Sequence, residues 1–267
     1  MTRRSAKASN KEVSTRHSTH STHSTKTKHE HERQHERVRS SSTEASKKFE
    51  LKNSTQRDIV RSIESNYLTI LCGSAGSGKT LMAIYSAYRM LKSPESNIEK
   101  IIVIRLAEQI FNENIGALPG EKDEKLLHLL APLLDNMALF MTPGEIKMLC
   151  DKGQIEVLPI SHCRGRSFIN CAIIVEEAQN MNYEMVMTAL TRLGEGSSMT
   201  ITGDHLQTDI KGRQGMKDAM YATENLDGVK IFKLSSVDIQ RHPLVQQIIK
   251  RIEERKGREE REEPKLR

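Results

Sequence analysis

The chain has 267 residues, of which 36% are hydrophobic, 28% are charged and 4% are aromatic, and its formal net charge is +6. This length suits one large domain, or one domain with tails, and is enough to bury a sizeable core. The apolar runs, such as residues 101–104, are far shorter than the ~18 residues of a membrane-spanning helix, and no apolar stretch follows the basic N-terminus. We therefore expect neither an integral membrane protein nor a secretory signal.

The cysteines indicate a reducing compartment. Cys72, Cys150, Cys163 and Cys171 form no C-x-x-C pair. Such a set favours reduced thiols over a disulfide framework or a zinc site. On these grounds we expect a cytoplasmic protein.

The positive charge is concentrated at the N-terminus. Residues 1–48 carry a net charge of +7 (12 Lys and Arg against 5 Asp and Glu), so the rest of the chain carries −1. This Ser/Thr/His-rich segment has almost no large apolar residues and repeats His at positions 17, 20 and 23. It cannot offset its ordering entropy by burial, which predicts a disordered basic tail. A solvated arm, adventitious metal binding and attraction to nucleic acid stay open as its roles.

The rest of the chain alternates helical patterns with short apolar segments. In chain order, the predicted elements are helix 54–65, strand 67–72, helix 79–92, strand 100–104, helices 121–139 and 143–150, strands 155–159 and 171–175, helix 182–193, strand 199–203, helix 215–225, strand 229–234 and helix 243–255. Apolar strands that alternate with helices predict an α/β domain, with a parallel sheet and helices on both faces. We assign residues 49–255 to this domain and residues 256–267 to a charged C-terminal tail.

The first predicted strand runs into a phosphate-binding loop. Its motif is G-x-x-x-x-G-K-T, placed between a strand and a helix, and consists of Gly73, Ser74, Ala75, Gly76, Ser77, Gly78, Lys79 and Thr80. The glycines let backbone N–H groups surround a phosphate, and the following helix adds the positive end of its dipole. Lys79 reaches the β- and γ-phosphates, and the Thr80 hydroxyl is a ligand for Mg²⁺. The complete motif in this context favours nucleotide binding over a plain Gly/Ser turn.

Two acidic residues follow the predicted strand 171–175. Glu176 and Glu177 leave this strand at its carboxyl end, where ligands bind to parallel sheets. One carboxylate can hold the water shell of Mg²⁺, and the other can act on an attacking water. The alternative is a charged start to the next helix, favoured by the helix dipole. Beside a phosphate loop, we favour a catalytic pair, with Glu176 on the metal and Glu177 on the water.

From Asn53 to about Ile252 the chain resembles the PhoH family of P-loop ATPases. The resemblance rests on motifs at residues 73–80, 118–120, 164–168, 177–180, 190–194, 203–207 and 238–242. The run R-G-R-S-F followed by E-E-A-Q-N is its most specific part. The family is similar to the ATPase core of superfamily 1 helicases, which implies a RecA-like fold with ATP and Mg²⁺ as ligands. The arrangement looks like the single-domain form that is frequent in bacteriophages.

The resemblance assigns further site residues. Gln56, at the start of a helix, resembles the helicase glutamine that reads the adenine edge, and a side-chain amide can donate and accept there. A polar residue in the first turn of a helix is the alternative. Asp204 and Gln207 resemble the element that senses the γ-phosphate, with Asp204 on the attacking water or Mg²⁺ shell and Gln207 on the phosphate. The alternative there is a G-D turn after a strand.

The sequence departs from the family pattern at two positions. The family usually has Asp-Glu at the strand end, where this chain has Glu176-Glu177, so the metal-holding carboxylate is one methylene longer. Displacements of ~1 Å near a reacting group can cost ~10²-fold in rate. The usual proline after the arginine of the second strand is replaced by Leu106, which puts only the local turn in doubt.

Four arginines are candidates to stabilise charge on the γ-phosphate: Arg164, Arg166, Arg192 and Arg241. For each of them the alternative is a surface ion pair. We favour Arg241, because it follows the last strand, where helicase-like cores place arginines near the nucleotide. A superfamily 1 helicase closes its site with a second RecA-like domain, for which this chain is too short. A neighbouring subunit would then supply the missing wall, which predicts a homo-oligomer and favours a ring.

The leading hypothesis is a Mg²⁺-dependent ATPase that acts on RNA or single-stranded DNA as an oligomeric, helicase-like motor. The alternative is an ATP-binding switch or scaffold with slow hydrolysis and no motor activity. The near-neutral body and the scarcity of aromatic residues favour this alternative, since single-strand binders stack bases on aromatics. A nucleotide kinase fits less well, because kinases lack the E-E-A-Q and G-D-x-x-Q pair.

Overall fold

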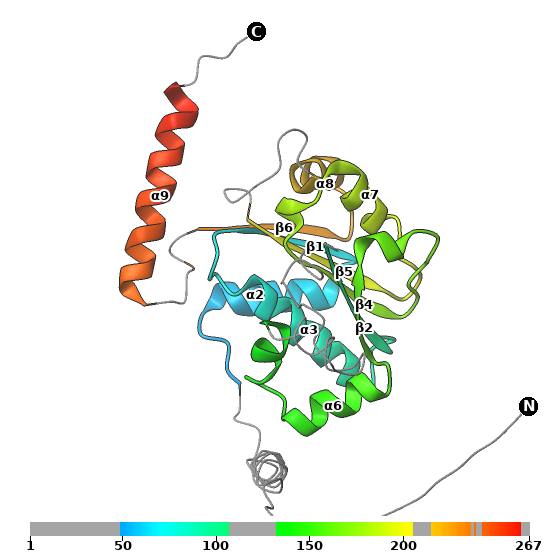
Figure 1. The fold of residues 1–267 in the computed structure, drawn as a ribbon. Coiled ribbons are helices and arrows are strands. Elements are labelled where there is room, and N and C mark those ends of the chain that lie inside the picture. Colours follow the sequence, from blue (N-terminus) through cyan, green and yellow to red (C-terminus); the bar gives the residue numbers. More distant parts are fainter. Residues whose placement is uncertain (1–48, 107–131, 205–214, 236–237, 239–241, 263–267) are drawn as a thin grey trace, which may run out of the picture. The chain divides into compact units, whose positions relative to one another are not determined.

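The computed structural model describes residues 49–106, 132–204, 215–235, 238 and 242–262. One six-stranded sheet forms its centre, with strand order β3-β2-β4-β5-β1-β6 and every neighbouring pair parallel (Figure 1). The strands are β1 (Leu68–Gly73), β2 (Lys100–Arg105), β3 (Ile155–Pro159), β4 (Cys171–Val175), β5 (Ser198–Gly203) and β6 (Val229–Leu234). All six predicted strands are therefore confirmed, with bounds that differ by at most one residue.

Helices cover both faces of the sheet, as predicted (Figure 1). On one face lie α2 (Ser54–Ser65), α3 (Lys79–Lys92) and α6 (Pro143–Asp151), and on the other lie α7 (Tyr183–Leu190) and α8 (Gly215–Thr223). Two short 3-10 helices follow strands: η1 (Ile160–Cys163) follows β3, and η2 (Ala178–Asn180) follows β4. The last helix is α9 (Pro243–Glu262).

The alternation of side chains along each strand divides the core into two layers. Leu71, Val103 and Ile174 pack with α2, α3 and α6, whereas their neighbours Ile70 and Ile173 pack with α7 and α8. Strands β1 and β4 are buried along their whole length. This double burial explains why their sequences are continuously apolar rather than alternating.

Helix α7 is shorter than the sequence predicted. It begins after Asn182, whose side chain accepts a hydrogen bond from the Met185 N–H at 2.9 Å, and it ends before Thr191. Leu193 instead forms a parallel bridge with Phe168. The predicted end at residue 193 was wrong because this long-range pairing competes with the helical pattern. Of the predicted helix 121–139, residues 121–131 lie outside the described part and residues 132–137 are helical.

The fold brings three strand ends together. Strand β1 pairs with β5 so that Cys72 lies opposite Gly203, and β4 pairs with β5 so that Val175 lies opposite Ile201. The segments that follow these strands are the phosphate loop, the acidic pair and Asp204. The parallel order therefore places the predicted site residues at one edge of the sheet, where ligands bind in open α/β folds.

All four cysteines are free thiols. Within the described ranges, no helix is both long and apolar enough to cross a membrane.

Candidate nucleotide site

The phosphate loop has the backbone shape that its sequence predicts. Gly76 and Gly78 have φ values of 85° and 81°, in the left-handed region that disfavours side chains. Gly78 is the N-cap of α3 and offers no side chain to cap the helix, so no cap of its own covers the first N–H groups of α3. Uncapped N–H groups at a helix start are an anion-binding arrangement.

Lys79 lies folded back over this loop. Its Nζ donates hydrogen bonds to the carbonyl oxygens of Gly73 and Ser74 at 2.7 and 2.9 Å. Burial lowers the pKa of Lys79, while the carboxylates of Asp204 and Glu177 act in the opposite direction. One ammonium group is thus set close to two predicted catalytic carboxylates.

Asp204 contacts the phosphate loop directly. Its Oδ2 accepts a hydrogen bond from the Ala75 N–H at 3.1 Å, and its side chain is buried. The contact joins the end of β5 to the loop after β1. The prediction that Asp204 belongs to the phosphate site fits this geometry, because a phosphate oxygen and a carboxylate oxygen are acceptors of the same kind.

Glu176 is buried beside the first residues of α3. Its carboxylate accepts a hydrogen bond from the Thr80 hydroxyl and lies 3.3 Å from Arg105 Nε. Burial raises the pKa of Glu176, while Arg105 and Thr80 act against that rise. The Thr80 hydroxyl and the Glu176 carboxylate, the two predicted magnesium ligands, are therefore neighbours at the start of α3.

The donor set fits magnesium only in company with a nucleotide. In the described part of the chain no group of three or more His, Cys, Asp or Glu side chains could hold a metal ion. Magnesium is commonly held by one or two protein groups together with phosphates and waters. Thr80 and Glu176 would supply such a partial set, and the phosphates would supply the rest.

Glu177 differs from Glu176 in the exposure of its side chain and in its backbone conformation. Its side chain is exposed, and its φ of 53° lies in the left-handed region, which is uncommon for a residue with a side chain. Its Oε2 accepts a hydrogen bond from Gln179 Nε2 at 2.6 Å. The two adjacent glutamates thus have distinct environments, one buried on Thr80 and Arg105 and one facing solvent.

Gln56 lies next to the phosphate loop. The Asn53 side chain caps α2 through the Gln56 N–H at 2.8 Å, and Gln56 Oε1 accepts from the Lys52 N–H at 2.7 Å. Gln56 Nε2 lies 3.8 Å from the position that a Cβ on Gly78 would occupy. The glutamine is therefore buried beside the loop, and its contact with a base stays a prediction.

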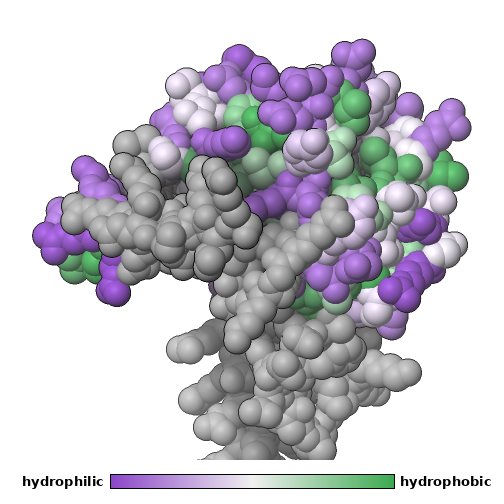
Figure 2. Space-filling view, turned by 90° about the horizontal axis from the view of Figure 1, so that it is seen from above, coloured by the Kyte–Doolittle hydropathy of each residue, from purple (hydrophilic) through white to green (hydrophobic). Residues whose placement is uncertain are grey.

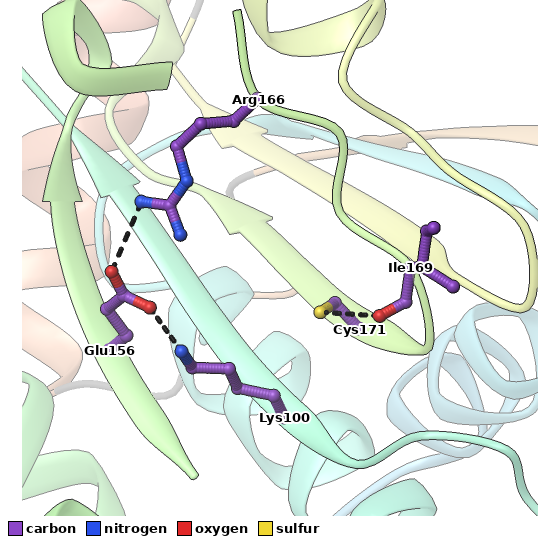
Figure 3. A network of polar contacts seen from close by, with 5 residues as sticks. All are labelled: Lys100, Glu156, Arg166, Ile169 and Cys171. Carbon is purple, nitrogen blue, oxygen red and sulfur yellow. Dashed lines mark hydrogen bonds and ion pairs between the residues drawn. The ribbon is translucent and has the colours of Figure 1, made fainter. Parts of the chain in front are cut away.

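Arg166 and Arg192 lie elsewhere in the subunit. Arg166 pairs with Glu156 on β3 at 3.2 Å, and Glu156 also binds Lys100 (Figure 3). Arg192 donates to the Arg166 carbonyl oxygen at 3.0 Å. Strand β3 is four strand spacings from β1, or roughly 19 Å at ~4.8 Å per strand. Both arginines thus brace the segment between β3 and β4 and do not reach the phosphate loop of their own chain.

The three remaining candidate residues are Arg164, Gln207 and Arg241. Arg164 is exposed at the end of η1. Gln207 and Arg241 lie outside the described residues, so their assignments stay predictions.

The family model described as PhoH-like protein matches residues 48–253. The chain belongs to the PhoH family. Within this family, it is 38% identical over 200 residues to a PhoH-like protein of Synechocystis and 37% identical over 205 residues to a PhoH-like protein of Bacillus subtilis. These alignments cover 74% and 76% of this chain but only 60% and 63% of the relatives. This chain therefore spans less than two thirds of the length of either relative.

Solved structures with a similar arrangement are distant in sequence. They include the large terminase of a thermophilic bacteriophage, at 11% identity and a TM-score of 0.46 over 76% of this chain and 50% of the terminase. Another is the Pif1 helicase of Candida albicans, at 12% identity and a TM-score of 0.36 over 70% of this chain and 41% of the helicase. These similarities are weak, and the fold assignment rests on the parallel sheet and phosphate loop themselves.

Two residues of the site were not among the sequence-based candidates. Arg105 ends β2 and pairs with Glu176, and Gln179 lies between Glu177 and Asp204. A signal for Gln179 was present in the run E-E-A-Q, but nothing in one sequence assigned it a partner. Arg105 could not be found without knowing that β2 lies beside β4.

Proposed function

We propose that this chain is a Mg²⁺-dependent ATPase that acts on RNA or single-stranded DNA as a homo-oligomer in the cytoplasm. The observation that carries the proposal is the phosphate loop with Lys79 folded over it, with Asp204 bound to its Ala75 N–H at 3.1 Å and with Glu177 linked to Asp204 through Gln179. A phosphate-binding cation, a carboxylate on the loop and an exposed carboxylate are the groups that phosphate hydrolysis uses.

Each residue of the site has a separate role in the proposed hydrolysis. The loop N–H groups and Lys79 bind the β- and γ-phosphates, and Gln56 contacts the adenine edge. Magnesium, when bound, neutralises charge on the phosphates. Glu177 orients the attacking water and accepts its proton, because it is the exposed carboxylate of the pair. Asp204 holds the same water or the metal's water shell, and Gln207 contacts the γ-phosphate.

Assembly completes the site in this proposal. A single α/β domain leaves the γ-phosphate open on one side, and an arginine from a neighbour would close that side and exclude water. Arg166 and Arg192 are already engaged away from their own phosphate loop. Arg164 is exposed, and Arg241 stays the preferred candidate to act across a subunit interface because it follows the last strand.

The surface offers limited means of binding nucleic acid. Hydrophilic and hydrophobic residues are interspersed on the face shown in Figure 2. Among the aromatic side chains that the structure describes, Tyr67 and Tyr221 are the exposed ones, at 70% and 84%. Exposed tyrosines can stack on bases, and the basic segment 1–48 adds charge that can pair with phosphates.

One observation favours the alternative, an ATP-binding switch with slow hydrolysis. The Glu176 carboxylate is paired with Arg105 and buried. A carboxylate engaged by an arginine is less available to the water shell of a metal ion. This alternative predicts tight ATP binding with turnover that neither RNA nor DNA increases.

The deciding experiment measures phosphate release from ATP, with and without Mg²⁺ and with single-stranded RNA or DNA, alongside the mass in solution. We expect Mg²⁺-dependent turnover that nucleic acid increases and a mass above that of one chain. Lys79→Ala should reduce turnover by about 100-fold or more, since it removes the charge on the phosphates. Lys92→Ala, at the other end of α3, is the matched control and should keep turnover. Unchanged turnover in Lys79→Ala would exclude this site as the source of activity.

A further inference from the structure

Gln179 occupies a buried position between the Glu177 carboxylate and the backbone N–H of Asp204. It lies in η2, the single helical turn that follows β4 and the glutamate pair. Its side chain is 5% exposed, although glutamine is usually a surface residue. A buried side-chain amide is costly unless its polar atoms are hydrogen-bonded, so its partners define its role.

Gln179 is hydrogen-bonded to two predicted site residues, Asp204 and Glu177. Gln179 Oε1 accepts a hydrogen bond from the Asp204 N–H at 2.9 Å, and Gln179 Nε2 donates to Glu177 Oε2 at 2.6 Å. A backbone N–H can only donate and an ionised carboxylate can only accept. The two neighbours therefore determine which way the amide faces. Through Asp204, which binds the Ala75 N–H, this chain of contacts runs from the phosphate loop to Glu177.

The neighbouring strand leaves room for this amide. A Cβ on Gly203 would lie 2.8 Å from Gln179 Oε1 and 2.4 Å from Met216 Sδ. Any side chain at position 203 would therefore push on the glutamine. The glycine at the end of β5 lets the amide approach the backbone of residue 204.

We propose that Gln179 is a positioning residue that holds the Glu177 carboxylate toward the bound γ-phosphate and links its position to Asp204. The proposal rests on the proposed ATPase function and names a residue that acts through Glu177. The bond from Nε2 fixes Oε2 and leaves Oε1 of Glu177 to accept a proton from water. Without this bond, the exposed side chain of Glu177 would be free to sample several rotamers.

The Gln179→Glu substitution distinguishes a role of Gln179 in positioning the Glu177 carboxylate from a role in packing alone. It keeps the size of the side chain and an acceptor for the Asp204 N–H, but it replaces the donor to Glu177 with a carboxyl. When both carboxyls are ionised they repel, and Glu177 moves away. When the new carboxyl is protonated at lower pH, it can donate to Glu177 again. Among the described residues, the charged groups near this position include Glu177, Asp204, Glu176 and Lys79, and the substitution changes none of them.

The experiment measures kcat and KM for ATP from pH 6 to pH 8.5, together with ADP affinity, for wild type and three variants. For Gln179→Glu we expect kcat to fall roughly 10- to 100-fold at pH 8, as a ~1 Å displacement would cause, with KM and ADP affinity within about three-fold. The ratio of its kcat to that of wild type should rise as the pH falls. Gln179→Met, of similar length but without a donor, should lose kcat at every pH. Gln154→Glu, half-buried before β3 at the opposite end of the sheet, is the charge-matched control and should behave as wild type.

The possible results of this experiment distinguish a failure of the Gln179 proposal from a failure of the proposed ATPase function. Wild type without turnover overturns the ATPase function, and the role of Gln179 falls with it. Wild type with turnover, and a Gln179→Glu variant with the same kcat and pH profile, overturns the role of Gln179 alone. A loss of kcat that is equal at every pH in both Gln179 variants also overturns it, because packing alone would then explain the loss.

Discussion

The carboxylate of Asp204 accepts a hydrogen bond from the backbone N–H of Ala75 at 3.1 Å. An acidic side chain from the end of β5 thus occupies an N–H group of the loop that would otherwise face a phosphate oxygen. Lys79 is likewise engaged by the carbonyl oxygens of Gly73 and Ser74. In the proposed ATPase, a bound nucleotide would replace these internal partners of the Ala75 N–H and of Lys79 with phosphate oxygens.

The first prediction concerns the longer acidic side chain at position 176. Glu176→Asp restores the residue usual in the family and draws the carboxylate away from Arg105, which leaves it more available to the water shell of magnesium. We expect turnover equal to or above that of wild type, whereas Glu176→Gln should lower it and raise the Mg²⁺ concentration needed for half-maximal turnover. A Mg²⁺ titration of phosphate release checks both. A loss of ten-fold or more in Glu176→Asp would show that the site is adapted to glutamate.

The second prediction is that Arg241 completes the site of a neighbouring subunit. Lys79→Ala and Arg241→Ala subunits should each be inactive alone. When the two are mixed, some interfaces combine an intact loop with an intact arginine, so part of the activity should return. Arg251→Ala, exposed on α9, is the matched control and should stay active alone. No recovery on mixing would place Arg241 within its own site, or outside catalysis altogether.

The third prediction concerns the basic segment 1–48. Its net charge of +7 should add affinity for nucleic acid through phosphate neutralisation, which weakens as salt rises. Deletion of residues 1–48 should leave ATP turnover unchanged and lower both the affinity for single-stranded RNA or DNA and its salt dependence. A full-length variant with the 12 Lys and Arg of the segment changed to Gln should match the deletion. Superimposable salt titrations for all three proteins would rule out this role.

The fourth prediction is a pH-dependent contribution of Glu156 to stability. Burial alone would raise the pKa of Glu156, but hydrogen bonds and charges from Lys100 and Arg166 hold it below its ordinary value of 4.5. A lowered folded pKa stabilises the fold fully above pH 4.5, and the stabilisation is lost as the pH falls through the folded pKa. Glu156→Gln should therefore cost about 1 kcal/mol in free energy of unfolding at pH 7, a modest figure because all three side chains are partly exposed.

Urea unfolding at pH 7 and pH 3 checks the fourth prediction. The difference between wild type and Glu156→Gln should shrink toward zero at the lower pH. Glu195→Gln, on an exposed loop, is the control and should match wild type at both values. A cost that is equal at both pH values would mean that Glu156 stabilises by packing and not by charge.

The strands, the phosphate loop and the acidic pair could be predicted from the sequence because each depends on neighbours along the chain. Strand β4 is continuously apolar, and Gly73 to Thr80 form a complete motif. The edge at which these segments meet follows from parallel topology, which alternating strands and helices already predict.

The residues that the sequence could not place depend on contacts between distant segments. Arg166 was one of four candidates to act on the γ-phosphate, and its ion pair with Glu156 on β3 could not be read from the sequence. Gln179 is hydrogen-bonded to the backbone of Asp204, 25 residues away. The end of α7 was misplaced because Leu193 pairs with Phe168. Each of these outcomes depends on tertiary contacts that outweigh local propensity.

The most direct test of the proposed ATPase centre compares wild type with Glu177→Gln. It measures the steady-state rate of phosphate release with ATP and Mg²⁺, and the affinity for ATP of the same preparations. Because the amide cannot accept a proton from water, we predict that kcat falls by about 100-fold or more while ATP affinity stays within about three-fold. Equal kcat in the two proteins, or wild type that binds ATP without releasing phosphate, would contradict hydrolysis at this site.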